Sequence, residues 1–248
     1  MDFTGRHVVI TGASTGIGRA TADRIVALGG RVTLIARRAA LLEDACAQLG
    51  GNASWAAADV GDKAQLITAL DRAAAQQGPI DALFLNAGTA GAVAPVQDYA
   101  DAVFDTVLAV NLKSPFWAIA HVLPGMVERG RGSILVTGSL ASERGMAGNV
   151  GYVASKHAVL GLARAVALEA APHGVRCNCI VPGFIETPML DALPPDALAT
   201  MAAATPQGRT GKASELADVA AFLLSDRASH VTGQSLAVDG GVLGTLRI

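Results

Sequence analysis

Short apolar runs rich in β-branched residues alternate with longer amphipathic stretches along the chain. The runs predict strands at 7–11, 31–36, 53–60, 80–88, 132–139, 175–183 and 235–241. The stretches predict helices at 16–30, 40–51, 62–78, 99–112, 115–129, 151–172 and 214–226, and Asp62 is placed to cap the third of them. Strands that are almost wholly apolar and alternate with helices indicate a parallel sheet covered on both faces. The sequence therefore predicts an α/β fold with a doubly wound sheet.

The segment 184–213 departs from this pattern. It contains two adjacent prolines, further Pro and Gly residues, and only weak periodicity. A long irregular segment beside the carboxyl ends of strands is often a substrate lid, so we expect a substrate loop there; a variable surface connection is the alternative. No linker, composition break or repeat divides the 248 residues, and this length suits one domain.

Composition narrows the class of protein. The chain is 51% apolar and 16% charged, its net charge is −2, and it has no lysine- or arginine-rich block, so we expect no nucleic-acid partner. The N-terminus lacks the layout of a signal peptide, and apolar runs are interrupted before the ~18 residues of a membrane span. Cys46, Cys177 and Cys179 form no disulfide framework. We interpret the last two as buried free thiols on one strand face rather than metal ligands, and we expect a cytoplasmic protein.

A glycine-rich turn, TGASTGIG, follows the first predicted strand at Thr11–Gly18. Gly12 permits the tight turn, whereas Gly16 and Gly18 remove side chains where backbone approaches a pyrophosphate and where the helix packs on the sheet. Backbone N–H groups then converge at the helix N-terminus, where an anion is favoured. A glycine triplet alone is weak evidence, because any tight turn attracts glycine. Its place at the first strand–helix crossover makes a dinucleotide site the favoured interpretation.

This turn, the triplet Asn86-Ala87-Gly88 and Tyr152 four residues before Lys156 resemble the short-chain dehydrogenase/reductase family. The resemblance covers essentially the whole chain, and further matches in the family's order are Asp59-Val60, Asn111, Ser139 and 182–187 (PGFIET). It implies a single-domain Rossmann-type sheet of about seven strands in the order 3-2-1-4-5-6-7. It also implies a nicotinamide cofactor and the interconversion of a ketone and a secondary alcohol.

Ketone reduction by a nicotinamide builds negative charge on the carbonyl oxygen, so the site needs a proton donor and a group that holds this oxygen. The resemblance assigns these roles to Tyr152 and Ser139. A free tyrosine ionises near pH ~10. The positive charge of Lys156, on the same helix face, would favour the phenolate. The resemblance also has Lys156 bind the cofactor ribose and Asn111 pass protons to solvent through a water. Taken alone, the Tyr–Lys pair is an ordinary surface pair and Asn111 a helix cap or break.

The resemblance implies further contacts with the cofactor. Asp59 would lie at the adenine, with a turn or capping aspartate as the alternative. The Ile185 backbone and the Thr187 hydroxyl would meet the carboxamide, with a plain strand-to-loop connection as the alternative. The whole expected set is Gly12, Ser14, Thr15, Gly16, Ile17, Gly18, Arg37, Arg38, Asp59, Val60, Asn86, Ala87, Gly88, Tyr152, Lys156, Pro182, Gly183, Ile185 and Thr187.

The end of the second predicted strand bears on the choice of cofactor. An acid there would bind the ribose 2′-OH of NAD and repel the extra phosphate of NADP. The chain instead has Ala36 followed by Arg37 and Arg38, whose guanidinium groups are suited to a phosphate. We therefore predict NADP(H), with NAD as the alternative. Thr15 stands where some NADP-using relatives carry a second basic residue, which departs from their pattern.

The sequence thus predicts an NADP-preferring oxidoreductase that acts on a free small-molecule carbonyl or alcohol. The layout is also close to the 3-oxoacyl-carrier-protein reductases of the family, which makes carrier-linked reduction the alternative. That activity needs a positive surface for an acidic carrier, to which Arg129 and Arg131 would contribute. His173, however, stands where those reductases tend to place an arginine.

A catalytically silent nucleotide sensor is the alternative from another class, and retention of the serine, tyrosine, lysine and asparagine together argues against it. The expected pocket walls, 89–98, 140–150 and 184–205, are mainly apolar, with Glu143, Arg144 and Asn149 as scattered polar groups. Relatives in the family are mostly tetramers, and the "VDGG" sequence near the C-terminus fits that plan. We therefore expect a homotetramer, with a dimer as the alternative.

Overall fold

The computed structural model describes residues 1–188, 190 and 194–245. Seven parallel strands form the main sheet, in the order β3-β2-β1-β4-β5-β6-β9. They are β1 (His7–Thr11), β2 (Arg31–Ala36), β3 (Ala53–Ala57), β4 (Ala82–Leu85), β5 (Gly132–Thr137), β6 (Val175–Pro182) and β9 (Ser235–Val238). The short strands β7 (Ile185–Glu186) and β8 (Gly211–Lys212) pair separately. Since β9 is the seventh strand of the main sheet, the expected order is confirmed.

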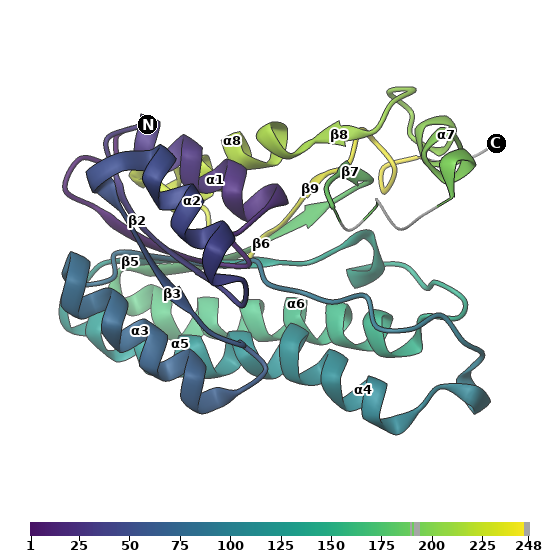
Figure 1. Ribbon diagram of the computed structural model, residues 1–248, viewed down its shortest axis with the longest axis horizontal. Coiled ribbons are helices and arrows are strands. Elements are labelled where there is room, and N and C mark those ends of the chain that lie inside the picture. The colour runs from purple at the N-terminus through teal and green to yellow at the C-terminus, as the bar shows by residue number, and fades with distance from the viewer. Residues whose placement is uncertain (189, 191–193, 246–248) are drawn as a thin grey trace.

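Helices cover both faces of this sheet. They are α1 (Gly16–Ala27), α2 (Ala39–Leu49), α3 (Lys63–Gln77), α4 (Asp101–Leu108), α5 (Ser114–Glu128), α6 (Val150–Ala170), α7 (Pro195–Ala204) and α8 (Ala213–Leu224). Figure 1 shows α1, α2 and α8 on one side of the sheet and α3, α5 and α6 on the other. The carboxylate of Asp62 accepts hydrogen bonds from the backbone N–H groups of Ala64 and Gln65, which confirms it as the cap of α3.

Strand β1 supplies side chains to two hydrophobic cores. Val8 and Ile10 belong to a cluster shared with α1 and α8, whereas Val9 belongs to a cluster shared with α3, α5 and α6. All five residues of β1 are buried. Burial on both faces is the reason that its sequence shows no polar alternation.

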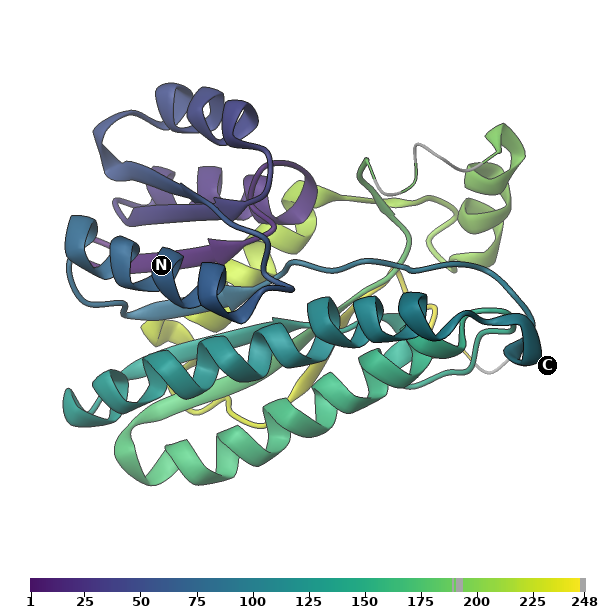
Figure 2. The ribbon, with the colours of Figure 1, turned by 60° about the horizontal axis from the view of Figure 1, so that its bottom comes forward.

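The helices expected at 99–112 and 115–129 are joined without a break. A π-helical turn, Ala109–Lys113, connects α4 to α5, and Figure 2 shows them as one continuous teal run beside the green α6. The joined helix, Asp101–Glu128, is long and apolar enough to cross a membrane, which the expectation of interrupted apolar runs missed. Its most apolar window is 39% buried in the described fold, and α4 and α5 contact α3, α6 and β5. Core helices of water-soluble proteins meet the same requirements, so this helix alone does not indicate a membrane protein.

The segment 184–213 is more ordered than the sequence indicated. It contains α7 and both members of the β7–β8 pair, with Ile185 opposite Gly211 and Glu186 opposite Lys212. A helix begins at Pro195 because proline fits the first helical turn, where its missing N–H is not needed. Residues 189 and 191–193 of this segment lie outside the described residues.

The turns that follow β1, β4 and β5 all lie at the carboxyl edge of the sheet, because these strands are parallel. Strand order reverses between β1 and β4. Open α/β sheets bind ligands outside the carboxyl ends of the strands at such a reversal. The fold therefore brings Gly12, Asn86 and Ser139, which follow these three strands, to one edge.

Candidate active site

The glycine loop forms a close-fitting backbone cradle at the start of α1. Gly12 and Gly16 have positive φ angles of 66° and 59°, which glycine adopts without strain. A Cβ atom on Gly18 would lie 2.5 Å from the Gly12 carbonyl oxygen, and one on Gly12 would lie 2.9 Å from Ala87 Cα. The first turn of α1 contains no acidic residue, so the positive end of its dipole is not neutralised. The cradle fits the pyrophosphate of a dinucleotide.

Arg38 lies against this loop. One of its guanidinium nitrogens, Nη2, donates to the hydroxyls of Ser14, at 3.2 Å, and Thr15, at 3.3 Å. Both Arg37 and Arg38 are exposed at the end of β2. Of the two arginines expected at the ribose end of the cofactor, Arg38 is thus the one in contact with the loop.

Asn86 connects the glycine loop to β5. Its amide Nδ2 donates to the carbonyl oxygens of Thr11 and Gly12, both at 3.3 Å, and its Oδ1 accepts from the Thr137 hydroxyl at 3.3 Å. A Cβ atom on Gly88 would lie 3.5 Å from Asn111 Oδ1 and 3.7 Å from Lys156 Nζ. The triplet Asn86–Gly88 therefore runs from the glycine loop to the expected catalytic residues.

Lys156 and Tyr152 lie one turn apart on α6. The side chain of Lys156 is buried, and its ammonium donates a 2.7 Å hydrogen bond to the carbonyl oxygen of Thr137, at the end of β5. The ammonium nitrogen lies 5.6 Å from the centroid of the Tyr152 ring, which is partly exposed. A buried ammonium needs hydrogen-bond acceptors, and Thr137 supplies one. This bond holds the charge beside the phenol.

Asn111 points from the π turn into the protein and is 2% exposed. Its Oδ1 accepts from Thr89 N at 2.9 Å, and its Nδ2 donates to Thr89 O at 2.9 Å and to Ser155 Oγ at 3.0 Å. The Ser155 hydroxyl in turn donates to the carbonyl of Tyr152 at 2.8 Å. Asn111 thus joins the loop after β4 to the first turn of α6, and its role in proton relay stays a prediction.

Ser139 caps a short turn, Leu140–Ser142, that contacts α6. Its Oγ accepts from Ala141 N at 3.2 Å, and its own N–H donates to Ser142 Oγ at 3.1 Å. A hydroxyl that accepts still has its O–H to donate. Ser139 is therefore available as a donor to a carbonyl oxygen at this edge.

The remaining expected positions surround the same edge. Thr187 lies against the glycine loop, since a Cβ atom on Gly16 would be 3.3 Å from Thr187 Cβ. The carboxylate of Asp59 accepts from Gly61 N at 2.9 Å in the turn after β3, beside the buried Val60. Ile185 is also buried and belongs to β7. Pro182 is the last residue of β6, and Gly183 follows it.

Three hydroxyl residues that hold the site together were missed from the expected set. Thr11 Oγ1 accepts from the backbone N–H groups of Asn86 and Ala87, at 3.1 and 3.2 Å. Thr137 supports Asn86 and Lys156, and Ser155 connects Asn111 to Tyr152. Each stands in or within two residues of a recognised motif, and this proximity is the signal that was available in the sequence.

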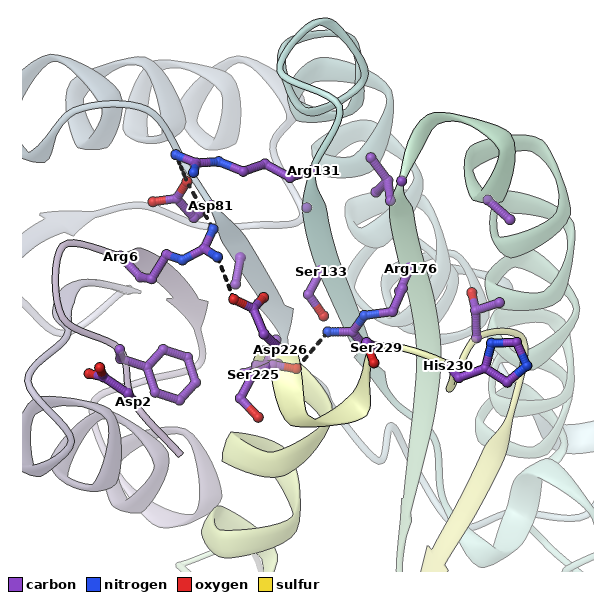
Figure 3. Close-up of a pocket in the computed structure, with 18 residues that line it drawn as sticks. Asp2, Arg6, Asp81, Arg131, Ser133, Arg176, Ser225, Asp226, Ser229 and His230 are labelled. Atoms are coloured by element: carbon purple, nitrogen blue, oxygen red, sulfur yellow. Dashed lines mark hydrogen bonds and ion pairs between the residues drawn. The ribbon is translucent and has the colours of Figure 1, made fainter.

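A cavity of about 550 Å³ lies at the opposite, amino edge of the sheet (Figure 3). Ion pairs cross it between Arg6 and Asp226, at 2.6 Å, and between Arg131 and Asp81, at 3.4 Å. It contains none of the expected catalytic residues. A cavity of about 310 Å³ instead lies beside residues 184 and 185, lined by Thr205, Gln207 and Asp239 among others. Neither cavity is lined by Asn111, Ser139, Tyr152 or Lys156, so neither identifies the active site.

The three cysteines are free, and Cys177 and Cys179 are buried, as the sequence predicted. Burial raises the pKa of Cys177 to about 12 and that of Cys179 to about 11. Neither thiol is therefore ionised at neutral pH. Within the described residues, no group of three or more His, Cys, Asp or Glu side chains is arranged to hold a metal ion.

Comparison with known proteins gives this geometry its context. The family model described as enoyl-(acyl carrier protein) reductase matches residues 12–243. The relatives described below match over nearly their whole length. The chain belongs to the short-chain dehydrogenase/reductase family.

Three relatives show the range of activities in this part of the family. Levodione reductase of Leifsonia aquatica is 38% identical, with 96% of this chain and 94% of the relative aligned. Cis-4-hydroxycyclohexanecarboxylate dehydrogenase of Sinomonas cyclohexanicum is also 38% identical, with 96% and 97% aligned. A 3-oxoacyl-[acyl-carrier-protein] reductase of Salmonella typhimurium is 36% identical, with 98% and 99% aligned. This family member is accordingly an oxidoreductase that interconverts a ketone and a secondary alcohol.

Solved structures agree with the fold. The crystal structure of levodione reductase superposes with a TM-score of 0.94 at 37% identity, covering 98% of this chain and all of the other. A 3-ketoacyl-(acyl-carrier-protein) reductase from Brucella melitensis, complexed with NADH, gives 0.92 at 30% identity and covers 96% and 98%. The glycine cradle and these relatives together support a nicotinamide cofactor for this family member.

Proposed function

We propose that this enzyme acts on free, compact ketones and secondary alcohols, prefers NADP(H), and uses Tyr152 as its general acid and base. The observation that carries the proposal is the contact of the buried Lys156 ammonium with both the Tyr152 ring and the Thr137 carbonyl. This contact lies at the edge of the sheet where the glycine cradle, Asn86 and Ser139 also meet.

The proposed mechanism divides the chemistry among four side chains. A bound nicotinamide supplies the hydride to the ketone or removes it from the alcohol. The Ser139 hydroxyl donates to the substrate oxygen, and the Tyr152 phenol delivers a proton to it or takes one from it. Lys156 stabilises the phenolate that remains. Asn111 holds the loop after β4 against α6, and we propose that it also passes protons to solvent through a water.

A free substrate is favoured over a carrier-bound one by the placement of the basic residues. Arg129 donates to the Ile80 carbonyl oxygen at 2.7 Å, and Arg131 pairs with Asp81. Both residues flank the amino end of β5, whereas Ser139 follows its carboxyl end. The two arginines expected to dock an acidic carrier are therefore engaged away from the proposed site. The dehydrogenase relative from Sinomonas, named for a hydroxycyclohexane substrate, supports a ring alcohol or ketone as the substrate class.

The proposed NADP(H) preference depends on the end of β2. Arg38 and the hydroxyls of Ser14 and Thr15 gather a cation and hydrogen-bonding groups at the glycine loop, and no acid follows Ala36. A 2′-phosphate there would accept from all three. The same place in an NAD-selective site would hold a carboxylate.

We also propose that 184–213 covers the substrate. The β7–β8 pair ties the two ends of this segment together, and α7 between them exposes apolar side chains such as Leu198. A helix that buries little surface, in a segment whose two ends are held together by a strand pair, is suited to close over a ligand.

Assembly as a homotetramer is proposed from exposed apolar side chains on two pairs of elements. Phe116 on α5 and Leu168 on α6 are 53% and 80% exposed. Phe222 on α8 and Leu236 on the edge strand β9 are 36% and 38% exposed. Two separate self-complementary contacts generate a tetramer, whereas one generates a dimer. Light scattering after gel filtration at micromolar concentration tests this.

The free thiols support a cytoplasmic location, which cell fractionation tests.

A substrate and cofactor panel tests the proposed function. Initial rates are measured for cyclohexanone, 4-oxocyclohexanecarboxylate, an open-chain ketone and an acetoacetyl thioester, each with NADPH and NADH. We expect kcat/KM to be highest for a ring ketone with NADPH, at least tenfold above the thioester and above the same ketone with NADH. A highest value for the thioester would instead favour carrier-linked reduction.

A further inference from the structure

The VDGG sequence, Val238–Gly241, begins a compact turn that we call the C-terminal turn, Asp239–Thr245. The two carboxylate oxygens of Asp239 accept from the backbone N–H groups of Gly241, at 2.8 Å, and Leu243, at 2.7 Å. Gly240 and Gly241 have positive φ angles of 62° and 97°. The aspartate therefore folds the turn and the glycines permit its backbone conformation.

One side of the C-terminal turn touches the base of α7. A Cβ atom on Gly240 would lie 2.6 Å from Thr205 Cγ2, and one on Gly241 would lie 3.2 Å from Pro206 Cγ. The Gly240 carbonyl oxygen also accepts from Gln207 N at 3.3 Å. Gly240 thus sets how closely the end of α7 approaches the rest of the protein.

The other side of the C-terminal turn touches the loop that follows Ser139. The carbonyl oxygen of Leu243 accepts from Arg144 Nη2 at 3.2 Å. At the start of β9, the strand that leads to the turn, the hydroxyl of Ser235 donates to Glu143 Oε1 at 2.8 Å. Beneath the turn, a Cβ atom on Gly183 would lie 2.6 Å from Asp239 Cα, so the end of β6 is in direct contact as well.

We propose that Asp239 and Gly240 are positioning residues for the substrate: the turn they form fixes the distance between the base of α7 and the loop after Ser139. The inference rests on the proposed function, because these two segments are the proposed walls of the substrate pocket. Neither residue contributes a group to the proposed proton transfer. Moving one wall should therefore change the fit of the substrate, whereas the glycine loop at Gly16 lies against Thr187 rather than against this turn.

Substitution of Gly240 provides the test, with a matched control and a rescue. Gly240→Ala places a methyl group against Thr205 Cγ2. Gly130→Ala imposes the same backbone strain, at a φ of 63°, but its methyl group meets nothing within 4 Å. Thr205→Ser removes Cγ2 and keeps the hydroxyl that donates to Met201 O. The double variant Gly240→Ala/Thr205→Ser therefore keeps the strain and relieves the contact.

KM for cyclohexanone, KM for NADPH and kcat are measured for each variant, with the acetoacetyl thioester assayed in parallel. We expect Gly240→Ala to raise KM of the accepted ketone at least fivefold, with kcat and KM for NADPH within twofold of wild type. Gly130→Ala should leave all three unchanged. The double variant should return the ketone KM to within twofold of Thr205→Ser alone.

Asp239 provides a second route should Gly240→Ala fold poorly. Asp239→Asn keeps one acceptor oxygen and Asp239→Ala keeps none, so the ketone KM should rise in that order. An unchanged ketone KM in these variants, an equal rise in Gly130→Ala, or no rescue by Thr205→Ser would overturn the inference. If Tyr152→Phe is inactive while these variants behave as wild type, the proposed function stands and only the positioning role fails.

Discussion

The Lys156 ammonium lies 5.6 Å from the centroid of the Tyr152 ring and donates a 2.7 Å hydrogen bond to the Thr137 carbonyl oxygen. Lys156 is 4% exposed, so water screens its charge poorly. Thr137 ends β5 two residues before Ser139. A single buried cation therefore connects the helix that carries the phenol to the strand that leads to the serine.

Removal of this cation should affect both catalysis and cofactor binding. In Lys156→Met, which keeps the length of the side chain, we expect kcat to fall by at least about 10²-fold, because the phenolate loses its nearest positive charge. NADPH should also bind more weakly, which fluorescence titration measures. The exposed Lys63→Met, at the start of α3, is the control. A kcat within threefold of wild type would contradict the role proposed for Lys156.

Arg38 should determine the choice of cofactor. Arg38→Asp replaces the proposed phosphate ligand with a repulsive charge, and we expect the ratio of kcat/KM for NADPH to that for NADH to fall by about 10–100-fold. Arg37→Asp should shift the ratio in the same direction but less, because Arg38 is the residue that reaches Ser14 and Thr15. The exposed Arg72→Asp on α3 is the charge-matched control. If the ratio of kcat/KM for NADPH to that for NADH is unchanged in both Arg38→Asp and Arg37→Asp, the basis for the NADP(H) preference is removed.

The hydrogen bonds of Asn111 should stabilise the folded protein, independently of any role of this residue in proton relay. In Asn111→Leu, the N–H and C=O of Thr89 and the hydroxyl of Ser155 lose their partner. We expect the free energy of unfolding to fall by about 2–4 kcal/mol. This corresponds to a Tm lower by about 5–15 °C, measured by scanning calorimetry. Asn111→Asp keeps the acceptor and should lose less. An unchanged Tm in Asn111→Leu would show that these hydrogen bonds contribute little.

Most of the sheet was predictable from the sequence, and the motifs of the candidate site could be recognised in it, because both rest on local signals. Strands β1 and β2 have the predicted bounds, since their apolar runs end where the chain leaves the sheet. Strand β4 was expected to continue to residue 88 but ends at Leu85. There the backbone N–H groups of Asn86 and Ala87 turn to the Thr11 hydroxyl, a contact across 75 and 76 positions that no local pattern reveals.

The same limit applies to Asn111 and to 184–213. Asparagine in a helical stretch suggests a break, yet the amide finds partners in Thr89 and Ser155, and a π turn accommodates it without ending the helix. Adjacent prolines suggest an irregular loop, yet Pro194 and Pro195 stand at the start of α7. In both places tertiary contacts or position within the helix, rather than residue type, decide the local structure.

The two buried thiols should make stability depend on alkaline pH. Burial raises the pKa of Cys177 to about 12 and of Cys179 to about 11, from an ordinary value of 9.0. Above pH 9 the two thiols lose their protons in the unfolded chain but keep them in the folded chain. The free energy of unfolding therefore has its full value below this pH and falls as the pH rises above it. Between pH 8 and pH 10 the loss should be about 2–3 kcal/mol for the pair. Urea unfolding at both pH values should show this loss in wild type, and Cys177→Ala/Cys179→Ala should lack it. Equal losses in the two proteins would contradict the assignment.

The most direct measurement compares turnover and cofactor binding in Tyr152→Phe, which removes one hydroxyl and keeps the ring beside Lys156. If Tyr152 is the general acid and base, kcat for the best ketone should fall by about 10²–10⁴-fold. The dissociation constant for NADPH should stay within twofold of wild type, because the glycine cradle and Arg38 are untouched. A kcat within tenfold of wild type, with binding intact, would contradict the proposed mechanism.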